Sequence, residues 1–282
     1  MRLGSRTKDR RVRGRGALAV AAVSLLAAAA PAAAATPAAH VWVTTPDGAM
    51  KLADRGVVSF RPGGSDALTI SVDPSRRYQT MDGFGASITD SSAHVLMRLS
   101  AQHRAAAMRS LFRDDRLSFL RQPIGASDFV AGDFYTYDDV PAGQTDYDMR
   151  RFSIAHDRAE ILPLLRQALA LNPRLKVIGS PWSPPAWMKT NQSLIGGRLI
   201  DEPRIYAAYA RYFVKFVRAY ARAGVPIYAL TVQNEPQNRK PRGYPGTDMP
   251  VAQEAKLIEA LGPALRRAHL HTKLLGYDHN WS

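Results

Sequence analysis

The 282-residue chain is 46% hydrophobic and 22% charged, which gives enough apolar material for one large folded domain with a core of its own. It contains no cysteine, and this excludes disulfides, thiolate metal sites and a cysteine nucleophile. The formal net charge is +14, and beyond residue 40 the excess positive charge is spread out without a dense run of Lys and Arg interleaved with aromatic residues, so nucleic-acid binding is not favoured.

The first forty residues have the pattern of a secretory leader. Seven Lys and Arg side chains precede an apolar, alanine-rich stretch at residues 17–30, and residues 33–35 offer an A-x-A cleavage site. A membrane anchor is the alternative, but the span is weakly hydrophobic and Pro31 breaks it. We therefore predict a signal peptide over residues 1–35, secretion, and no stable membrane span after cleavage. The leader holds a net +6 of the +14, which leaves +8 for the rest of the chain.

Residues 36–77 contain short β-type runs at 41–43, 57–60 and 67–72, separated by Pro-Asp-Gly and Pro-Gly-Gly turns. Such short strands do not close a core by themselves. We predict that they belong to a β side domain, and we expect them to pair with strands encoded beyond the end of this sequence.

From residue 78 onward, strand-like and helix-like segments alternate. The expected strands cover residues 82–88, 117–124, 175–180, 227–233 and 273–277; the expected helices cover 100–112, 156–171, 203–222 and 251–261, the last ending at a Gly-Pro break. This alternation predicts an α/β fold with a parallel sheet and right-handed crossovers.

We interpret residues 78–282 as about five of the eight units of a (β/α)8 barrel, also called a TIM barrel. The sequence stops a few residues past the fifth expected strand. We expect a fragment or a truncated product, poorly stable alone because a sheet edge stays open.

The fourth expected strand ends in Asn234-Glu235-Pro236, which places an amide and a carboxylate at its C-terminal end. In a βα barrel that end carries the chemistry. A polar strand end that caps the next helix is the structural alternative for Asn234. Similar polar and aromatic groups follow the other strands.

Four such motifs occur in order: Met81-Asp-Gly-Phe-Gly-Ala86, Arg121 with Asp128-Phe129, Pro181-Trp182, and Asn234-Glu235-Pro236. With them, residues 79–281 closely resemble glycoside hydrolase family 30, the family that contains glucosylceramidase. The resemblance implies a retaining β-glycosidase, and it assigns roles to six residues of this chain.

By that resemblance Glu235 is the general acid/base, and Asn234 binds the sugar 2-hydroxyl. Asp128 accepts hydrogen bonds from sugar hydroxyls, and Trp182 forms an aromatic wall of the sugar subsite. Arg121 bonds the catalytic carboxylates and keeps them ionised, although a structural ion pair inside the barrel is an overlapping alternative. We also expect Phe129 to line the pocket.

A retaining mechanism needs a second carboxylate about 5 Å from the first. The resemblance places this nucleophile after strand seven, which the sequence does not contain, so we assign none. The segment Asp278–Trp281 ends the fifth strand, and whether it reaches the pocket rim stays open.

Three functional hypotheses remain. The leading one is a glucosylceramidase-like hydrolase of β-linked glucosides that acts on a carbohydrate or glycolipid substrate. The alternatives are an endo-β-1,6-glucanase or xylanase of the same family, and a non-catalytic fragment with at most sugar binding. We expect this chain alone to be inactive. We predict no cofactor and no metal, because His269 and His271 precede the fifth strand, at the face opposite the chemistry.

Overall fold

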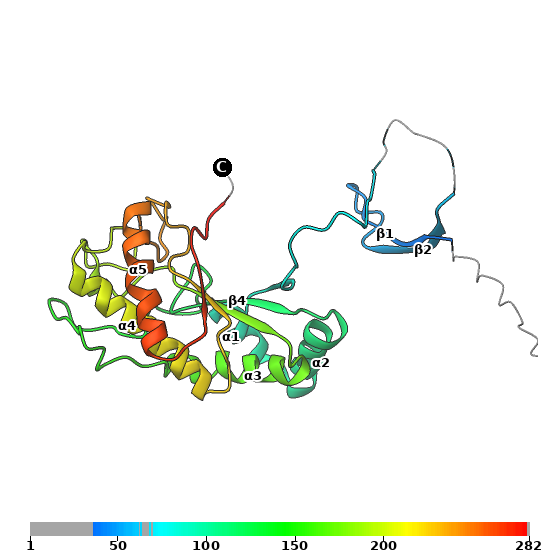
Figure 1. Cartoon of the computed structure of the whole chain (residues 1–282). Coiled ribbons are helices and arrows are strands. Elements are labelled where there is room, and N and C mark those ends of the chain that lie inside the picture. The colour runs from blue at the N-terminus through cyan, green and yellow to red at the C-terminus, as the bar shows by residue number, and fades with distance from the viewer. Residues whose placement is uncertain (1–35, 62, 64–67, 69, 281–282) are drawn as a thin grey trace, which may run out of the picture. The chain divides into compact units, whose positions relative to one another are not determined.

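The computed structural model describes residues 36–280, except 62, 64–67 and 69, so the predicted signal peptide lies outside the described residues. The chain divides into two compact units, residues 1–77 and residues 78–282 (Figure 1). Within the described ranges, we find no helix whose length and hydropathy would let it span a bilayer.

The first unit contains one antiparallel pair, β1 (Ala38–Val43) and β2 (Ala53–Ser59). These two strands pair with each other, and the expected pairing with strands encoded beyond the end of the sequence stays a prediction. Val57, Val58 and Phe60 stay exposed, so the pair encloses little core of its own. In the expected strand at 67–72, two residues lie outside the described set and the other four form no strand.

The second unit is built on a five-stranded parallel sheet whose strands are neighbours in chain order. Its strands are β3 (Gly85–Ala86), β4 (Phe119–Pro123), β5 (Lys176–Ser180), β6 (Ala229–Thr231) and β7 (Lys273–Leu275). Parallel neighbours joined by helical crossovers are the arrangement of a βα barrel, so the predicted fold class is confirmed; a closed barrel has eight such strands.

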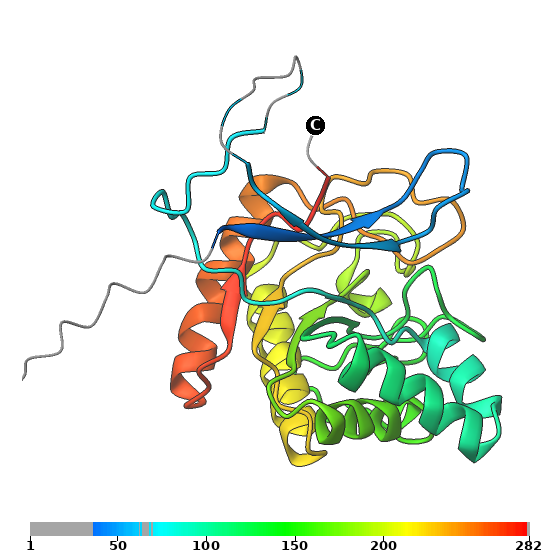
Figure 2. The ribbon, with the colours of Figure 1, turned by 90° about the vertical axis from the view of Figure 1, so that its right-hand side faces the viewer.

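Helices connect these strands along the chain (Figure 2). They are α1 (Asp90–Arg98), α2 (Ala101–Arg109), the π-helical η1 (Ser110–Asp114), the 3₁₀ turn η2 (His156–Arg158), α3 (Ile161–Leu171), the 3₁₀ turn η3 (Ala186–Met188), α4 (Pro203–Arg222) and α5 (Val251–Arg267). Helices α4 and α5 lie side by side (Figure 1).

Two helix predictions are corrected by the structure. The break expected at Gly262-Pro263 is wrong, since α5 continues to Arg267. Its buried residues Leu257, Leu261 and Leu265 form one apolar stripe across the proline, and the burial of that stripe outweighs the missing backbone hydrogen bond. Helix α1 was not predicted, and Ala93 is its one buried residue.

Part of the core of this unit lies between the sheet and α4. The apolar face of α4 is buried there: Tyr206, Tyr209, Phe213, Phe216 and Tyr220, together with Val217. Glycine lets the helix approach the sheet: a Cβ at Gly179 of β5 would lie 2.9 Å from the Phe216 ring and 3.0 Å from Ile124. This close packing of α4 against Gly179 holds the end of β5, where Ser180 follows.

Candidate functional site

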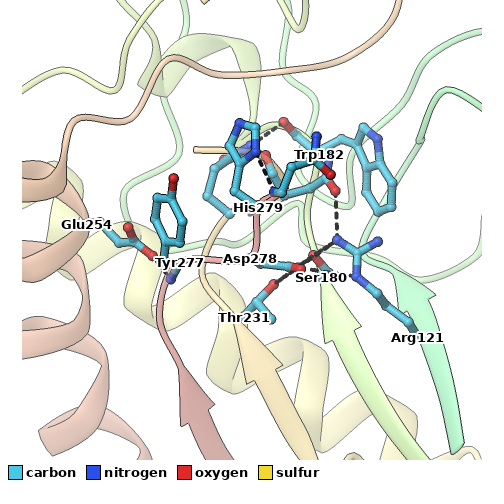
Figure 3. Close-up of polar contacts among 11 residues, drawn as sticks. Arg121, Ser180, Trp182, Thr231, Glu254, Tyr277, Asp278 and His279 are labelled. Atoms are coloured by element: carbon cyan, nitrogen blue, oxygen red, sulfur yellow. Dashed lines mark hydrogen bonds and ion pairs between the residues drawn. The ribbon is translucent and has the colours of Figure 1, made fainter. Parts of the chain in front are cut away.

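One carboxylate oxygen joins the C-terminal ends of four strands. Asp278, which follows β7, accepts hydrogen bonds at Oδ2 from Arg121 Nη2 at 2.6 Å, Ser180 Oγ at 2.8 Å and Thr231 Oγ1 at 2.8 Å. These donors come from β4, β5 and β6. The four side chains point toward one another (Figure 3).

The guanidinium of Arg121 also orients the predicted sugar-binding residues. Its Nη2 donates to the side-chain oxygen of Asn234 at 2.7 Å, and its carbon lies 4.8 Å from the centre of the Trp182 ring. The oxygen of the Asn234 amide is therefore engaged, and its NH2 is the end left to donate to a ligand. Trp182 is 8% exposed and Asn234 9% exposed, so both are held by their surroundings.

Main-chain contacts set the position of Glu235. Its N–H donates to the Asp278 carbonyl at 2.8 Å, and the Asn234 N–H donates to the Pro181 carbonyl at 2.7 Å. Glu235 has φ +46°, in the left-handed region where a residue with a side chain is strained. Such strain at a polar strand end is a common sign of function.

The carboxylate of Glu235 has a polar neighbour of its own. Asn238 Nδ2 donates to Glu235 Oε2 at 2.9 Å, and the same Nδ2 lies 3.0 Å from the Tyr244 hydroxyl. The amide thus occupies one oxygen of the carboxylate, while the half-buried side chain keeps its other oxygen available to solvent or ligand.

The segment that carries Asp278 is anchored from the helix behind it. Glu254, in the first turn of α5 and 6% exposed, accepts a hydrogen bond at Oε1 from the Tyr277 N–H at 2.7 Å (Figure 3). Tyr277 has φ +54°, so the chain turns sharply before Asp278. Glu254 therefore holds the turn that brings the Asp278 carboxylate to Arg121.

Asp128 and Phe129 share no hydrogen bond with this cluster in the part of the chain that the structure describes. Both are on the loop after β4, and both are exposed, Phe129 by 61%. The described residues donate no hydrogen bond to the Asp128 carboxylate, whereas the Phe129 carbonyl accepts one from the Ser91 N–H at the start of α1. The structure thus brings Arg121, Trp182, Asn234 and Glu235 together, and the roles of Asp128 and Phe129 stay predictions.

Sequence reasoning missed several members of the site: Ser180, Thr231, Asn238, Tyr244 and the Asp278 pairing with Arg121. Arg121 was expected to bond the catalytic carboxylates, yet the carboxylate it contacts is that of Asp278. An arginine inside a barrel needs a counter-charge, and this requirement was the signal that pointed to an acid at a neighbouring strand end.

No metal centre is found among residues 36–280 that the structure describes, since no three His, Asp or Glu side chains gather there. His269 lies in the turn between α5 and β7, where its N–H donates to the Arg266 carbonyl. The histidine pair is thus at the opposite end of β7 from Asp278.

Comparisons with known proteins identify relatives of this chain. Residues 81–281 match the model of the glycosyl hydrolase family 30 TIM-barrel domain. An endo-1,6-β-D-glucanase of Neurospora crassa is 37% identical over 251 residues, which cover 86% of this chain and 52% of that protein. The lysosomal acid glucosylceramidase of Mus musculus is 32% identical over 239 residues, covering 81% of this chain and 45% of the mouse protein.

Among solved structures, an endo-β1,6-glucanase superposes with a TM-score of 0.69 at 34% sequence identity, covering 85% of this chain and 52% of its own. The chain thus spans about half the length of the curated relatives it matches. A family match over residues 81–281, on a parallel sheet whose strand ends gather Arg121, Asn234 and Glu235, means that this chain belongs to glycosyl hydrolase family 30.

Proposed function

We propose that Glu235 is the general acid/base of a retaining β-glycosidase that cleaves β-linked glucosides. The observation that carries the proposal is the 2.7 Å contact between Arg121 and the Asn234 oxygen, which leaves the amide NH2 free beside the acid. An NH2 in that place donates to a sugar 2-hydroxyl, a bond that strengthens as positive charge develops on the sugar ring.

In the proposed reaction the Glu235 carboxylic acid protonates the leaving oxygen, and the resulting carboxylate later deprotonates the attacking water. Asn238 occupies Oε2, so we assign the transferred proton to Oε1. A nucleophilic carboxylate about 5 Å away completes a retaining site. Asp278 is unsuited to that role, because its Oδ2 already accepts hydrogen bonds from the side chains of Arg121, Ser180 and Thr231.

On this reasoning the chain by itself binds sugar but does not turn it over, since no described acid is assigned as nucleophile. Secretion is proposed on the leader pattern alone. The partner is a carbohydrate or a glycolipid with a β-linked glucose.

Internal β-1,6-glucan linkages are a second candidate substrate. The Neurospora crassa relative carries that activity in its name at 37% identity, against 32% for the mouse glucosylceramidase, and one superposing structure is also an endo-β1,6-glucanase. Comparing hydrolysis of a β-1,6-glucan with hydrolysis of glucosylceramide distinguishes the two candidates.

The acid/base role is tested with Glu235→Gln, which keeps the shape of the side chain and removes its proton transfer. In a catalytically complete protein carrying this segment, we expect hydrolysis to fall at least ~100-fold for alkyl glucosides. The fall should be smaller for nitrophenyl glucosides, whose leaving groups need little protonation. Rates on a series of leaving groups give this comparison.

The control is Glu259→Gln, on the exposed side of α5. It should leave both rates unchanged. Equal losses for Glu235→Gln across leaving groups of different acidity would contradict the acid role. For the 282-residue chain itself, turnover of nitrophenyl β-glucoside that Glu235→Gln abolishes would show that a described acid does serve as nucleophile.

A further inference from the structure

A cavity lies between the loop after β4 and the loop after β5. Its volume is about 240 Å³, and residues 140–145 form one wall while Ala186, Trp187 and Gln192 form the other. Both loops leave the C-terminal ends of their strands, the end that carries Glu235. None of these residues belongs to the cluster around Asp278.

The lining of this cavity is uncharged in a chain of strongly positive net charge. It combines the indole of Trp187, the amides of Gln144 and Gln192 and the hydroxyl of Thr145. Anionic and cationic ligands find no counter-charge in such a lining. A sugar ring fits it, since its C–H face packs on an aromatic surface and its hydroxyls bond to amides and hydroxyls.

The size of the cavity also limits its occupant. Sites for drug-sized ligands measure about 300–1,000 Å³, so 240 Å³ is suited to a single small ring. A lipid chain needs a longer apolar channel than these residues form. One unit of an oligosaccharide therefore fits better than the tail of a glycolipid.

The aromatic wall is fixed before any ligand binds. Trp187 is 8% exposed, and its Nε1 donates to Asp138 Oδ2 at 3.1 Å. The Tyr147 ring meets the indole edge to face, with 5.3 Å between ring centres. Gln144 is also oriented, because its oxygen accepts from Arg151 at 3.0 Å and its NH2 stays available. A wall held in this way lowers the ordering cost of binding.

Trp187 follows Trp182 by five residues in one loop. Five residues span at most about 18 Å, a distance that a few linked sugar units can bridge. We propose that the cavity at Trp187 is a second subsite that holds one neutral unit of a β-glucan chain whose other end lies against Trp182. This inference rests on the proposed function, and it favours a polymeric substrate over a glycolipid.

The test is a calorimetric titration of the full chain with glucose and with a β-1,6-linked glucose tetrasaccharide. The variant Ala142→Trp fills the mouth of the cavity from an exposed loop position. It should weaken tetrasaccharide binding at least ~10-fold, about 1.4 kcal/mol, and leave glucose binding unchanged. Gln144→Ala should weaken the tetrasaccharide in the same direction, and it is the second variant if Ala142→Trp does not fold.

The matched control is Ala106→Trp, which places the same side chain on the exposed surface of α2 and should change neither affinity. Trp182→Ala should weaken both ligands. Tetrasaccharide binding that is unaffected by the folded Ala142→Trp and Gln144→Ala variants overturns the subsite while the function at Trp182 stands. If neither sugar binds the unmodified chain, the proposed function fails and the subsite fails with it.

Discussion

At the scale of single residues, Asp278 has the largest set of polar contacts in the site. Replacing it with Asn puts an NH2 in place of a carboxylate oxygen and leaves Arg121 without its ion-pair partner. Since Arg121 and Asp278 are 33% and 23% exposed, solvent screens part of the effect, and we expect Asp278→Asn to lower the free energy of unfolding by about 1–3 kcal/mol. Urea denaturation measures this change.

Asp148→Asn is the matched control. Asp148 pairs with Arg150 at 3.2 Å on the surface, where both side chains are mostly exposed, so its loss should cost less than about 1 kcal/mol. Equal losses for Asp148→Asn and Asp278→Asn would mean that the Arg121 contact adds nothing beyond a surface pair.

Lys189 is fully buried, and it joins two loops of the site. Its ammonium donates to Ser183 Oγ at 3.0 Å, to the Leu194 carbonyl at 3.1 Å and to the Gly246 carbonyl at 2.8 Å. Burial lowers the pKa of Lys189 from 10.5 to about 7, although three acceptors around Nζ favour the charged form.

Between pH 7 and pH 10.5 the unfolded chain therefore binds more protons at Lys189 than the folded chain does. The contribution of this group to the free energy of unfolding rises with pH in that window, by at most about 1.4 kcal/mol per pH unit. The Lys189→Met variant lacks this rise. Urea denaturation of both proteins at pH 6.5 and pH 9 should show a stability difference that grows toward pH 9; a constant difference contradicts the lowered pKa.

At the scale of elements, the glycine of β5 decides how closely α4 packs. A Cβ at Gly179 would lie 2.9 Å from Phe216, 3.0 Å from Ile124 and 3.1 Å from Leu230, so these packed side chains would have to shift. Gly179→Ala should therefore lower the free energy of unfolding by about 1–3 kcal/mol through overpacking. Gly132→Ala is the control, because nothing lies within 4 Å of the added methyl group. Thermal unfolding measures the melting temperatures of the two variants. Equal melting temperatures would show that the side chains around β5 shift to accommodate the added methyl group.

The sequence predicts some of these elements better than others, for physical reasons. Helix α4 has the predicted bounds Pro203–Arg222, because its aromatic stripe and its final glycine are local signals. The end of α5 was wrong, since burial of Leu265 depends on tertiary packing that local rules do not include. Strand β3 is only two residues long, because pairing with β4 and not composition limits it.

The same distinction applies to the site. Asn234 and Glu235 follow a recognisable apolar run, and the strand-end argument locates them from the sequence. The partner of Arg121 is 157 residues away along the chain, and its place depends on the left-handed turn at Tyr277. The sequence of residues 273–278 does not predict that turn, so the contact between Arg121 and Asp278 could be found only in the structure.

At the scale of the molecule, the parallel sheet of the described residues has β3 and β7 at its edges. An exposed edge offers unpaired backbone groups to a second chain, and Leu275 on β7 is 43% exposed. We expect the 282-residue chain to associate at micromolar concentration, and Leu275→Lys to reduce this association because a charge on an edge strand opposes pairing. Light scattering after size exclusion measures the mass of both proteins. A monomeric mass for the unsubstituted chain across that range would contradict this expectation.

The positive φ of Glu235 has a consequence for protein engineering. Glycine adopts that backbone geometry without penalty, whereas any residue with a Cβ pays about 1–2 kcal/mol for it. A screen that selects for thermal robustness alone will therefore favour glycine at position 235 and discard the carboxyl group. At position 235, selection for stability favours glycine, whereas selection for catalysis favours glutamate.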